Sequence, residues 1–268
     1  MLLGSASCGL GSESTKAQES RYNNVCADRP AIDNDTLYFC GTLDDAFVAF
    51  LSRSVSPNIS KLIITSYGGQ FDATKEAFEI VENSKLKVVV EGVCASACAH
   101  FLFIPASRGE VLPGAILALH TSSTSQRVMR LRSEWQEYER LKPLMDVAAE
   151  KERAFYIEHG LDPRLLLEPT LVMRPACVSE KIDWSDPLTP KMDYLSESLW
   201  WTPRQAELER FGMKSKDGFW VETLSDLQLL AASNKKFRLG MITAVSPSGS
   251  LMTEKALGQI PKCETLGK

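Results

Sequence analysis

The sequence predicts an α/β fold in which helices cover a mainly parallel sheet, with a long amphipathic helix and a small C-terminal extension added to it. Two observations predict this fold. Short apolar, β-branched runs at residues 61–64 and 88–90 are typical of buried strands in a parallel sheet. A helical pattern at residues 71–84 lies between them. Strands that alternate with helices in this way form βαβ units, which make the sheet parallel.

The first half of the chain divides into strands and helices in turn. Residues 33–41 are predicted as a first strand, and residues 44–54 as a helix with aspartates in its opening turn. Residues 61–66 form the next strand. The helix at 71–84 gathers its apolar side chains on one side, namely Ala73, Ala77, Phe78, Ile80 and Val81. A further strand is expected at 114–122.

The pattern changes in the second half. Residues 125–158 are strongly charged, and their apolar residues recur every three or four positions, at Val128, Leu131, Trp135, Tyr138, Leu141 and Met145. This spacing predicts a long amphipathic helix, interrupted near Pro143. A short helix at 224–233 and a strand at 236–245 are predicted near the end. We therefore divide the chain into a flexible segment (1–30), a main domain (31–217) and a C-terminal extension (218–268).

Ser96 stands where a predicted strand gives way to a helix. Small residues, Gly92, Ala95 and Ala97, surround it, and an apolar helix-like run follows. A tight turn there holds the serine near a helix N-terminus, where unpaired N–H groups and the positive end of the dipole stabilise an oxyanion. Two interpretations fit this segment: a serine nucleophile, or a serine N-cap with small residues that allow close packing.

Two other segments favour the nucleophile. Gly68 and Gly69 follow the strand at 61–66, and adjacent glycines let a backbone approach a ligand closely with its N–H groups facing outward. His120 lies near the end of the strand at 114–122. The three segments thus supply an oxyanion hole, a nucleophile and a base in order along the chain.

The same segments carry a family resemblance. Ser-Tyr-Gly-Gly at 66–69, Cys-Ala-Ser-Ala-Cys at 94–98 and Leu-His at 119–120 resemble the Clp-type serine proteases of the crotonase-like superfamily. The likeness is greatest to exported bacterial proteins that have this Cys-Ala-Ser-Ala-Cys sequence, and it covers about residues 36–213. It implies a fold of repeated ββα turns, a helix that mediates subunit contacts, and therefore a homo-oligomer; packing of that helix on its own sheet is the alternative.

The resemblance also implies roles for individual residues. Ser96 would be the nucleophile and His120 the general base. The oxyanion would be bound by the backbone N–H of Ala97 and that of Gly68 or Gly69. Removing one such donor typically lowers turnover about a hundred- to a thousand-fold.

A third catalytic residue, an acid that orients the histidine, is implied shortly before a motif resembling residues 201–213. Counting back from this motif leads to Asp193. The nearby alternatives are Asp183, Asp186 and Glu197. One residue departs from the family: Tyr67 stands where proline is usual, which puts the shape of the peptide-binding edge in doubt.

The chain has two other histidines. His100 lies four residues after Ser96, on the same face of a predicted helix, from which its ring is poorly aimed at the serine oxygen. It is predicted to be a packed helix residue or an accessory polar contact. His159 fits the last turn of a helix, where a cation suits the dipole. His120 remains the candidate base.

Composition narrows the function. With 268 residues, of which 44% are hydrophobic, the chain can bury a large core. A formal charge of −4 and the lack of a basic cluster argue against nucleic acid as the main partner. No apolar stretch approaches the roughly 20 residues of a membrane-spanning helix. The sequence indicates no cofactor and no metal site.

The amino terminus and the cysteines bear on localisation. Residues 1–8 resemble the end of a secretory signal or a lipoprotein cleavage site, and an ordinary disordered tail fits equally well. The seven cysteines contain no Cys-x-x-Cys pair. If Cys8 carried a lipid, six would remain, an even number compatible with periplasmic disulfides. Cys94 and Cys98 brace the turn at Ser96 either as packed thiols or through bonds to other cysteines. We expect an exported, periplasmic protein, with a cytoplasmic one as the alternative.

Two functions remain open at this point. The first is a serine hydrolase, a peptidase that acts on a peptide or protein through Ser96, His120 and an acid. The second is a catalytically inactive scaffold of the same fold that binds peptides. Acyl-CoA chemistry on this fold uses an oxyanion hole and carboxylates rather than a serine–histidine pair, so the sequence favours the hydrolase.

Overall fold

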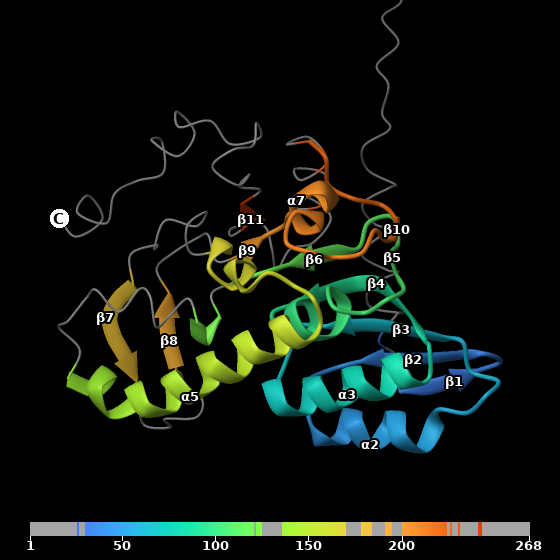
Figure 1. Ribbon diagram of the computed structural model, residues 1–268, viewed down its shortest axis with the longest axis horizontal. Helices are drawn as coiled ribbons and strands as arrows, with labels where there is room; N and C mark the ends of the chain where they lie inside the picture. Colours follow the sequence, from blue (N-terminus) through green and yellow to red (C-terminus); the bar gives the residue numbers. More distant parts are fainter. Residues whose placement is uncertain are drawn as a thin grey trace, which may run out of the picture.

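The structure, a computed structural model, describes residues 26, 30–120, 122–124, 136–169, 178–183, 191–194, 200–223, 226, 230 and 241–242. At 136–142, 178–183, 191–194, 200 and 241–242 it describes the backbone alone. Over these residues the chain is a mixed α/β protein (Figure 1).

A seven-stranded sheet forms the centre of the protein. Its strands lie in the order β1 (Ala31–Asp33), β2 (Thr36–Cys40), β3 (Lys61–Ser66), β4 (Lys87–Ala95), β5 (Gly109–Val111) and β10 (Asp217–Gly218), and β6 (Ile116–Ala118) pairs with β4. The pair β1–β2 is antiparallel, and the other pairs described in this sheet are parallel. The predicted α/β class and mainly parallel sheet are confirmed, and the repeated ββα turns stay a prediction.

The strand β4 changes its partner halfway along. Its first half pairs with β5, with Val88 opposite Gly109. Its second half pairs with β6, with Ala95 opposite Ala118. Since β4 and β6 are parallel and Ala95 lies opposite Ala118, the carboxyl ends of these two strands lie next to each other. The residues that follow them along the chain therefore emerge side by side.

The first predicted strand is divided in two. Residues 33–41 were expected to form one strand, but Asp33 pairs with Thr36 across a turn between β1 and β2. Asn34 has a φ of +51°, in the left-handed region that asparagine tolerates better than most residues. This turn reverses the chain, so the prediction of a single strand is wrong at its amino end.

Two helices cover one face of the sheet, below it in Figure 1: α2 (Asp45–Ser54) and α3 (Phe71–Asn83). Both were predicted. The carboxylate of Asp44 caps α2 by accepting hydrogen bonds from the N–H groups of Ala46 (3.0 Å) and Phe47 (3.2 Å). Along α3 the buried side chains are Ala73, Thr74, Ala77, Phe78 and Val81.

The two faces of the sheet contribute to separate apolar clusters. Alternation along β4 turns Cys94 toward the larger cluster, under α2 and α3, and its neighbours Val93 and Ala95 toward the smaller one. The smaller cluster also contains Ile116, Ala118, Val221 and Leu230, with Tyr67 and Phe219 packed against it. The end of β4, which leads into Ser96, is therefore buried on both faces.

A third helix, α5 (Gln136–Glu158), packs against α3. The ring of Phe155 meets those of Phe71 and Phe78 edge to face, at 6.1 and 5.3 Å between centroids. Pro143 lies inside α5, and the helix continues past it, so the predicted interruption is wrong. Most side chains that define the predicted amphipathic pattern lie outside the described residues, as do residues 125–135, and that pattern stays a prediction.

The remaining elements are η2 (Pro163–Leu166), β7 (Val178–Asp183), β8 (Lys191–Tyr194), β9 (Trp200–Trp201), α7 (Gln205–Glu209) and β11 (Met241–Ile242). The pair β7–β8 is antiparallel, and β9–β11 is parallel. Of the predicted helix at 224–233, only residues 226 and 230 are described. The domain boundaries near residues 30 and 217 stay predictions. The helices that the structure describes are all too short or too polar to cross a membrane.

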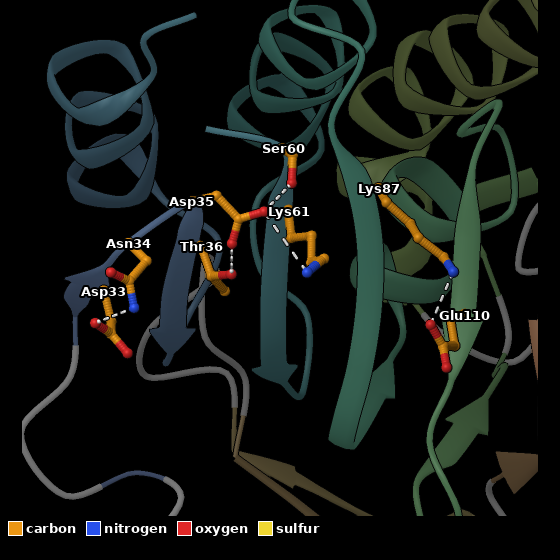
Figure 2. A network of polar contacts seen from close by, with 8 residues as sticks. All are labelled: Asp33, Asn34, Asp35, Thr36, Ser60, Lys61, Lys87 and Glu110. Carbon is orange, nitrogen blue, oxygen red and sulfur yellow. Dashed lines mark hydrogen bonds and ion pairs between the residues drawn. The ribbon is translucent and has the colours of Figure 1, made fainter. Parts of the chain in front are cut away.

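Polar contacts link the amino ends of the parallel strands, at the edge of the sheet opposite the carboxyl ends of β4 and β6 (Figure 2). The ammonium of Lys87 lies 2.8 Å from the carboxylate of Glu110 on β5 and 2.9 Å from that of Asp217 on β10. The carboxylate of Asp35 accepts a hydrogen bond from Ser60, which is the main reason that its pKa is lowered. This edge is therefore occupied by structural ion pairs and hydrogen bonds.

One lysine is buried against the sheet. Lys216 is 5% exposed, and its ammonium donates to the carbonyl oxygen of Ala106 at 2.6 Å. Burial lowers the pKa of Lys216 to about 8. Between that value and the ordinary 10.5, the unfolded chain binds more protons than the folded one. Folding stability should therefore rise as the pH is raised through this interval.

We predict that Lys216→Met removes this rise, which amounts to about 3 kcal/mol in the free energy of unfolding if the whole shift is lost. Chemical denaturation between about pH 8 and pH 10.5 measures it. The matched control is Lys214→Met, at an exposed lysine two residues away, which should keep the slope. Equal slopes in the two variants would show that Lys216 is not the group responsible.

Candidate active site

Ser96 occupies a sharp turn at the carboxyl end of β4. Its φ of +55° lies in the left-handed region, which is uncommon for a residue other than glycine and is found at functional turns. The N–H of Ser96 donates to the carbonyl of Ala118 on β6 (3.1 Å), and its own carbonyl accepts from the N–H of His100 (2.9 Å). A π-helix, η1 (Cys98–Phe103), follows. The predicted strand–turn–helix geometry around the serine is present.

His120 lies two residues beyond the end of β6, next to Ser96. The residue before it, Leu119, exchanges two backbone hydrogen bonds with Trp201, at 2.8 and 2.7 Å. His120 is partly buried, and its Nε2 lies 2.5 Å from the Oγ of Ser96. The structure therefore brings together the serine and the histidine that the sequence singled out, 24 residues apart, in the geometry of a nucleophile and its base.

The two glycines after β3 lie against this turn. Gly68 has a φ of +103°, and a Cβ at this position would come within 2.7 Å of the Cβ of Ser96 and 2.9 Å of the backbone nitrogen of Ala97. At Gly69, a Cβ would lie 2.2 Å from the carbonyl oxygen of Leu43. Glycine is required at both positions for the backbone to approach so closely.

The hydrogen bonds of these glycines separate their possible roles. The N–H of Gly68 donates to the Oγ of Ser66 at 3.0 Å, so it is already engaged. Leu43 bonds to the carbonyl of Gly68 and to the N–H of Gln70, both at 2.9 Å. Since alternate residues of an extended chain point to opposite sides, the N–H of Gly69 faces away from Leu43. Of the two predicted glycine donors, Gly69 is the better placed to donate to a charged oxygen.

A disulfide bond closes the turn that carries the serine. Cys94 and Cys98 are bonded to each other, with their Cα atoms 5.2 Å apart, and both are fully buried. The sequence left two alternatives open for these residues, namely packed free thiols or disulfides with other cysteines. The structure shows neither, because Cys94 and Cys98 form a disulfide with each other. The resulting loop encloses Ser96. A second disulfide joins Cys26 to Cys40.

We predict that replacing both Cys94 and Cys98 with alanine loosens this turn. The unfolding free energy should fall by about 2 kcal/mol from lost loop closure alone. Reaction of Ser96 with a fluorophosphonate should slow by about ten- to a hundred-fold, because misplacing a reacting atom by about 1 Å costs on the order of a hundred-fold. Rates of adduct formation, followed by mass spectrometry, measure the effect.

The matched control for this prediction is the double alanine variant at Cys26 and Cys40, which removes the other disulfide. It should lose stability without slowing the reaction of Ser96. If the two double variants reacted at the same rate as the unchanged protein, the disulfide at the turn would have no part in holding the serine.

The third predicted residue is not placed by its side chain. Asp193 lies in β8, of which only the backbone is described, and the same holds for Asp183 in β7. Asp186 and Glu197 lie outside the described residues. The identity of the acid therefore stays a prediction. Trp201, the first residue of the motif at 201–213, forms backbone hydrogen bonds with Leu119, the residue before the candidate base.

The other two histidines are not candidates for the base. His159 follows the end of α5 and packs against the rings of Phe78 and Phe155, at 4.7 and 4.5 Å between centroids. Burial lowers its pKa, which disfavours the cation that the end of the helix would otherwise stabilise. His100 is 2% exposed; burial first, and then the nearby His120, lower its pKa to about 3, and it is neutral at ordinary pH.

No three metal-binding side chains converge within the part of the chain that the structure describes. The sequence matches no protein-family model and no curated protein. Among solved structures, one that is similar is a point mutant of ClpP1 from Listeria monocytogenes. The TM-score is 0.32 and the identity 17%, over 53% of this chain and 77% of that one.

Proposed function

We propose that this protein is a serine hydrolase, a peptidase that forms an acyl-enzyme on Ser96. One observation carries the proposal: the Oγ of Ser96 lies 2.5 Å from the Nε2 of His120, at a turn whose backbone is held in the left-handed region. A serine that only caps a helix needs neither a histidine at that distance nor a left-handed backbone.

The chemistry follows from this pair. As the Oγ of Ser96 attacks the carbonyl carbon of the substrate, the Nε2 of His120 takes its proton. The tetrahedral intermediate then collapses: the bond from carbon to the leaving nitrogen breaks, and the proton on His120 passes to that nitrogen. Water repeats the sequence on the acyl-enzyme, with His120 again as base, and frees Ser96.

Charge develops on the carbonyl oxygen during both steps. The N–H groups of Gly69 and Ala97 are the proposed donors to it, since that of Gly68 is bonded to Ser66. Among the described residues, neither of the two proposed donors bonds to another group. Backbone donors that are fixed in place before the reaction need no reorganisation when the charge forms.

An acid that orients His120 completes the proposal. Asp193 is our candidate because of its distance before the motif at 201–213, with Asp183, Asp186 and Glu197 as alternatives. Its role would be to hold the ring of His120 in one tautomer and to stabilise the imidazolium. Replacement of each acid by its amide, in turn, identifies the one on which the reaction of Ser96 depends.

We also propose an exported protein that acts on peptides or proteins. The support for export is the pair of disulfides, Cys94–Cys98 and Cys26–Cys40, since such bonds persist in oxidising compartments such as the periplasm. The support for a peptide substrate is the resemblance around Ser96. A homo-oligomer, with α5 as a contact helix, is part of the same proposal.

Labelling with a fluorophosphonate tests the hydrolase. The reagent phosphonylates activated serines, and peptide mapping by mass spectrometry then locates the adduct. We expect an adduct on Ser96 in the unchanged protein and none on this peptide in Ser96→Ala. A folded protein that stays unlabelled would favour the alternative of an inactive peptide-binding scaffold.

A further inference from the structure

His100 connects the candidate base to the helical layer behind it. The Nδ1 of its ring lies 2.9 Å from the hydroxyl of Tyr156 on α5, and its Nε2 lies 3.3 Å from the carbonyl oxygen of His120. Tyr156 is fully buried and His100 is 2% exposed. A series of polar groups buried in an apolar core lowers stability unless each group is hydrogen-bonded. Its presence here therefore points to a role beyond core packing.

The direction of each hydrogen bond in this chain is fixed by chemistry. A carbonyl oxygen can only accept, so the Nε2 of His100 carries the proton and donates to His120. Since the ring is neutral, its Nδ1 has a free lone pair and accepts from the hydroxyl of Tyr156. Both polar atoms of the buried ring are thereby used, and the tautomer of His100 is set by the backbone of the base.

A second side chain of α5 holds the segment that follows the base. The carboxylate of Glu152 accepts hydrogen bonds from the N–H of Ser123 (3.0 Å), the N–H of Thr124 (2.9 Å) and the hydroxyl of Thr124 (2.8 Å). Glu152 is 5% exposed and lies four residues before Tyr156, so both project from one face of the helix. The chain on the far side of His120 is thus tied to the same helix.

We infer that α5 positions His120 for reaction with Ser96, through Tyr156 and His100 at its carbonyl and through Glu152 at the segment beyond it. The inference rests on the proposed hydrolase function and adds positioning residues to it. His100 touches neither the serine oxygen nor a substrate by this account. It acts on the base by fixing the peptide group from which the base projects.

The expected effect follows from the geometry of the pair. The Nε2 of His120 must stay within hydrogen-bonding reach of the Oγ of Ser96, now 2.5 Å away, and a displacement of about 1 Å costs on the order of a hundred-fold in rate. Substrate affinity should change little, because the groups proposed to bind the substrate lie after β3 and at the turn after β4. A loss in kcat with an unchanged KM therefore identifies a positioning role.

The experiment compares His100→Phe with His100→Gln, using p-nitrophenyl acetate for kcat and KM and a fluorophosphonate for the rate of labelling at Ser96. Phenylalanine fills the space and removes both polar contacts. We expect kcat and the labelling rate to fall about ten- to a hundred-fold, with KM within about two-fold. Glutamine returns an N–H near the place of Nε2 and should recover most of the rate.

Two further variants separate positioning from general damage. His159→Phe makes the same change at a histidine that packs on Phe155, away from the pair, and should react at the unchanged rate. His100→Phe leaves the hydroxyl of Tyr156 buried without its acceptor, which lowers the melting temperature. The double variant His100→Phe/Tyr156→Phe removes both polar partners, should recover the melting temperature, and should stay slow.

The outcomes are distinguishable. An unchanged protein that is not labelled at Ser96 overturns the proposed function, and this inference with it. If the unchanged protein is labelled and the double variant is labelled at the same rate, the hydrolase stands and the positioning role is overturned. A slow double variant that melts at the normal temperature, with rescue by His100→Gln, supports the role of α5.

Discussion

Ser96→Ala is expected to abolish covalent reaction with a fluorophosphonate, and His120→Ala to slow it by about 10³- to 10⁴-fold. The first variant removes the attacking oxygen. The second removes the group 2.5 Å away that takes the proton, and the serine hydroxyl is a weak nucleophile without it. The quantity to measure is the second-order rate constant of adduct formation, with the site of the adduct determined by peptide mapping.

The control for this prediction is Ser107→Ala, at an exposed serine whose hydroxyl and N–H bond to Glu82 rather than to either member of the pair. It should react as the unchanged protein does, and all three variants should melt cooperatively. An adduct that formed equally fast in His120→Ala would show that the serine is not activated by this histidine, however close the two atoms lie.

Gly68→Ala is expected to disrupt the turn that carries Ser96. Its Cβ would lie within 3.0 Å of the Cβ of Ser96, the carbonyl of Ala95 and the nitrogen of Ala97, and its φ of +103° is unfavourable for any side chain. Two of these three contacts are backbone atoms that cannot rotate away. We expect a loss of about 3 kcal/mol or more in the free energy of unfolding, and loss of labelling at Ser96.

Gly160→Ala provides the matched comparison. Its φ of +71° carries a similar backbone penalty, but nothing lies within 4 Å of the added Cβ. This variant should lose only about 1–2 kcal/mol and keep the reaction at Ser96. Denaturation curves and labelling rates of the two variants separate backbone strain from close approach. Equal losses would mean that the contact of Gly68 with the serine turn contributes nothing of its own.

Local signals explain why much of this fold could be predicted. The aspartate cap of α2 at Asp44, the apolar runs of β3 and β4, and the apolar side of α3 all depend on residues close in sequence. The glycine pair and Ser96 were identifiable for the same reason, since a tight turn needs small residues. His120 was identified from its place near the end of a predicted strand and from the family resemblance of the Leu-His pair at 119–120.

The remaining features depend on contacts between distant residues, which no local pattern specifies. Spacing placed His100 near Ser96, but its bond to Tyr156 joins residues 56 positions apart. Seven cysteines allow many pairings, so the bond between Cys94 and Cys98 was one of several. The turn at Asn34 was missed because the residues before and after it favour strands. One long strand and two short strands joined by a tight turn therefore show a similar sequence pattern.

Trapping the acyl-enzyme tests the central claim most directly. The protein is mixed with p-nitrophenyl acetate, quenched in acid within the first turnover, and analysed by mass spectrometry. The account predicts one acetyl group per chain, located on Ser96, together with a burst of nitrophenolate and no such adduct in Ser96→Ala. A folded protein that shows no acetyl group on Ser96, or carries it on another residue instead, would contradict the account.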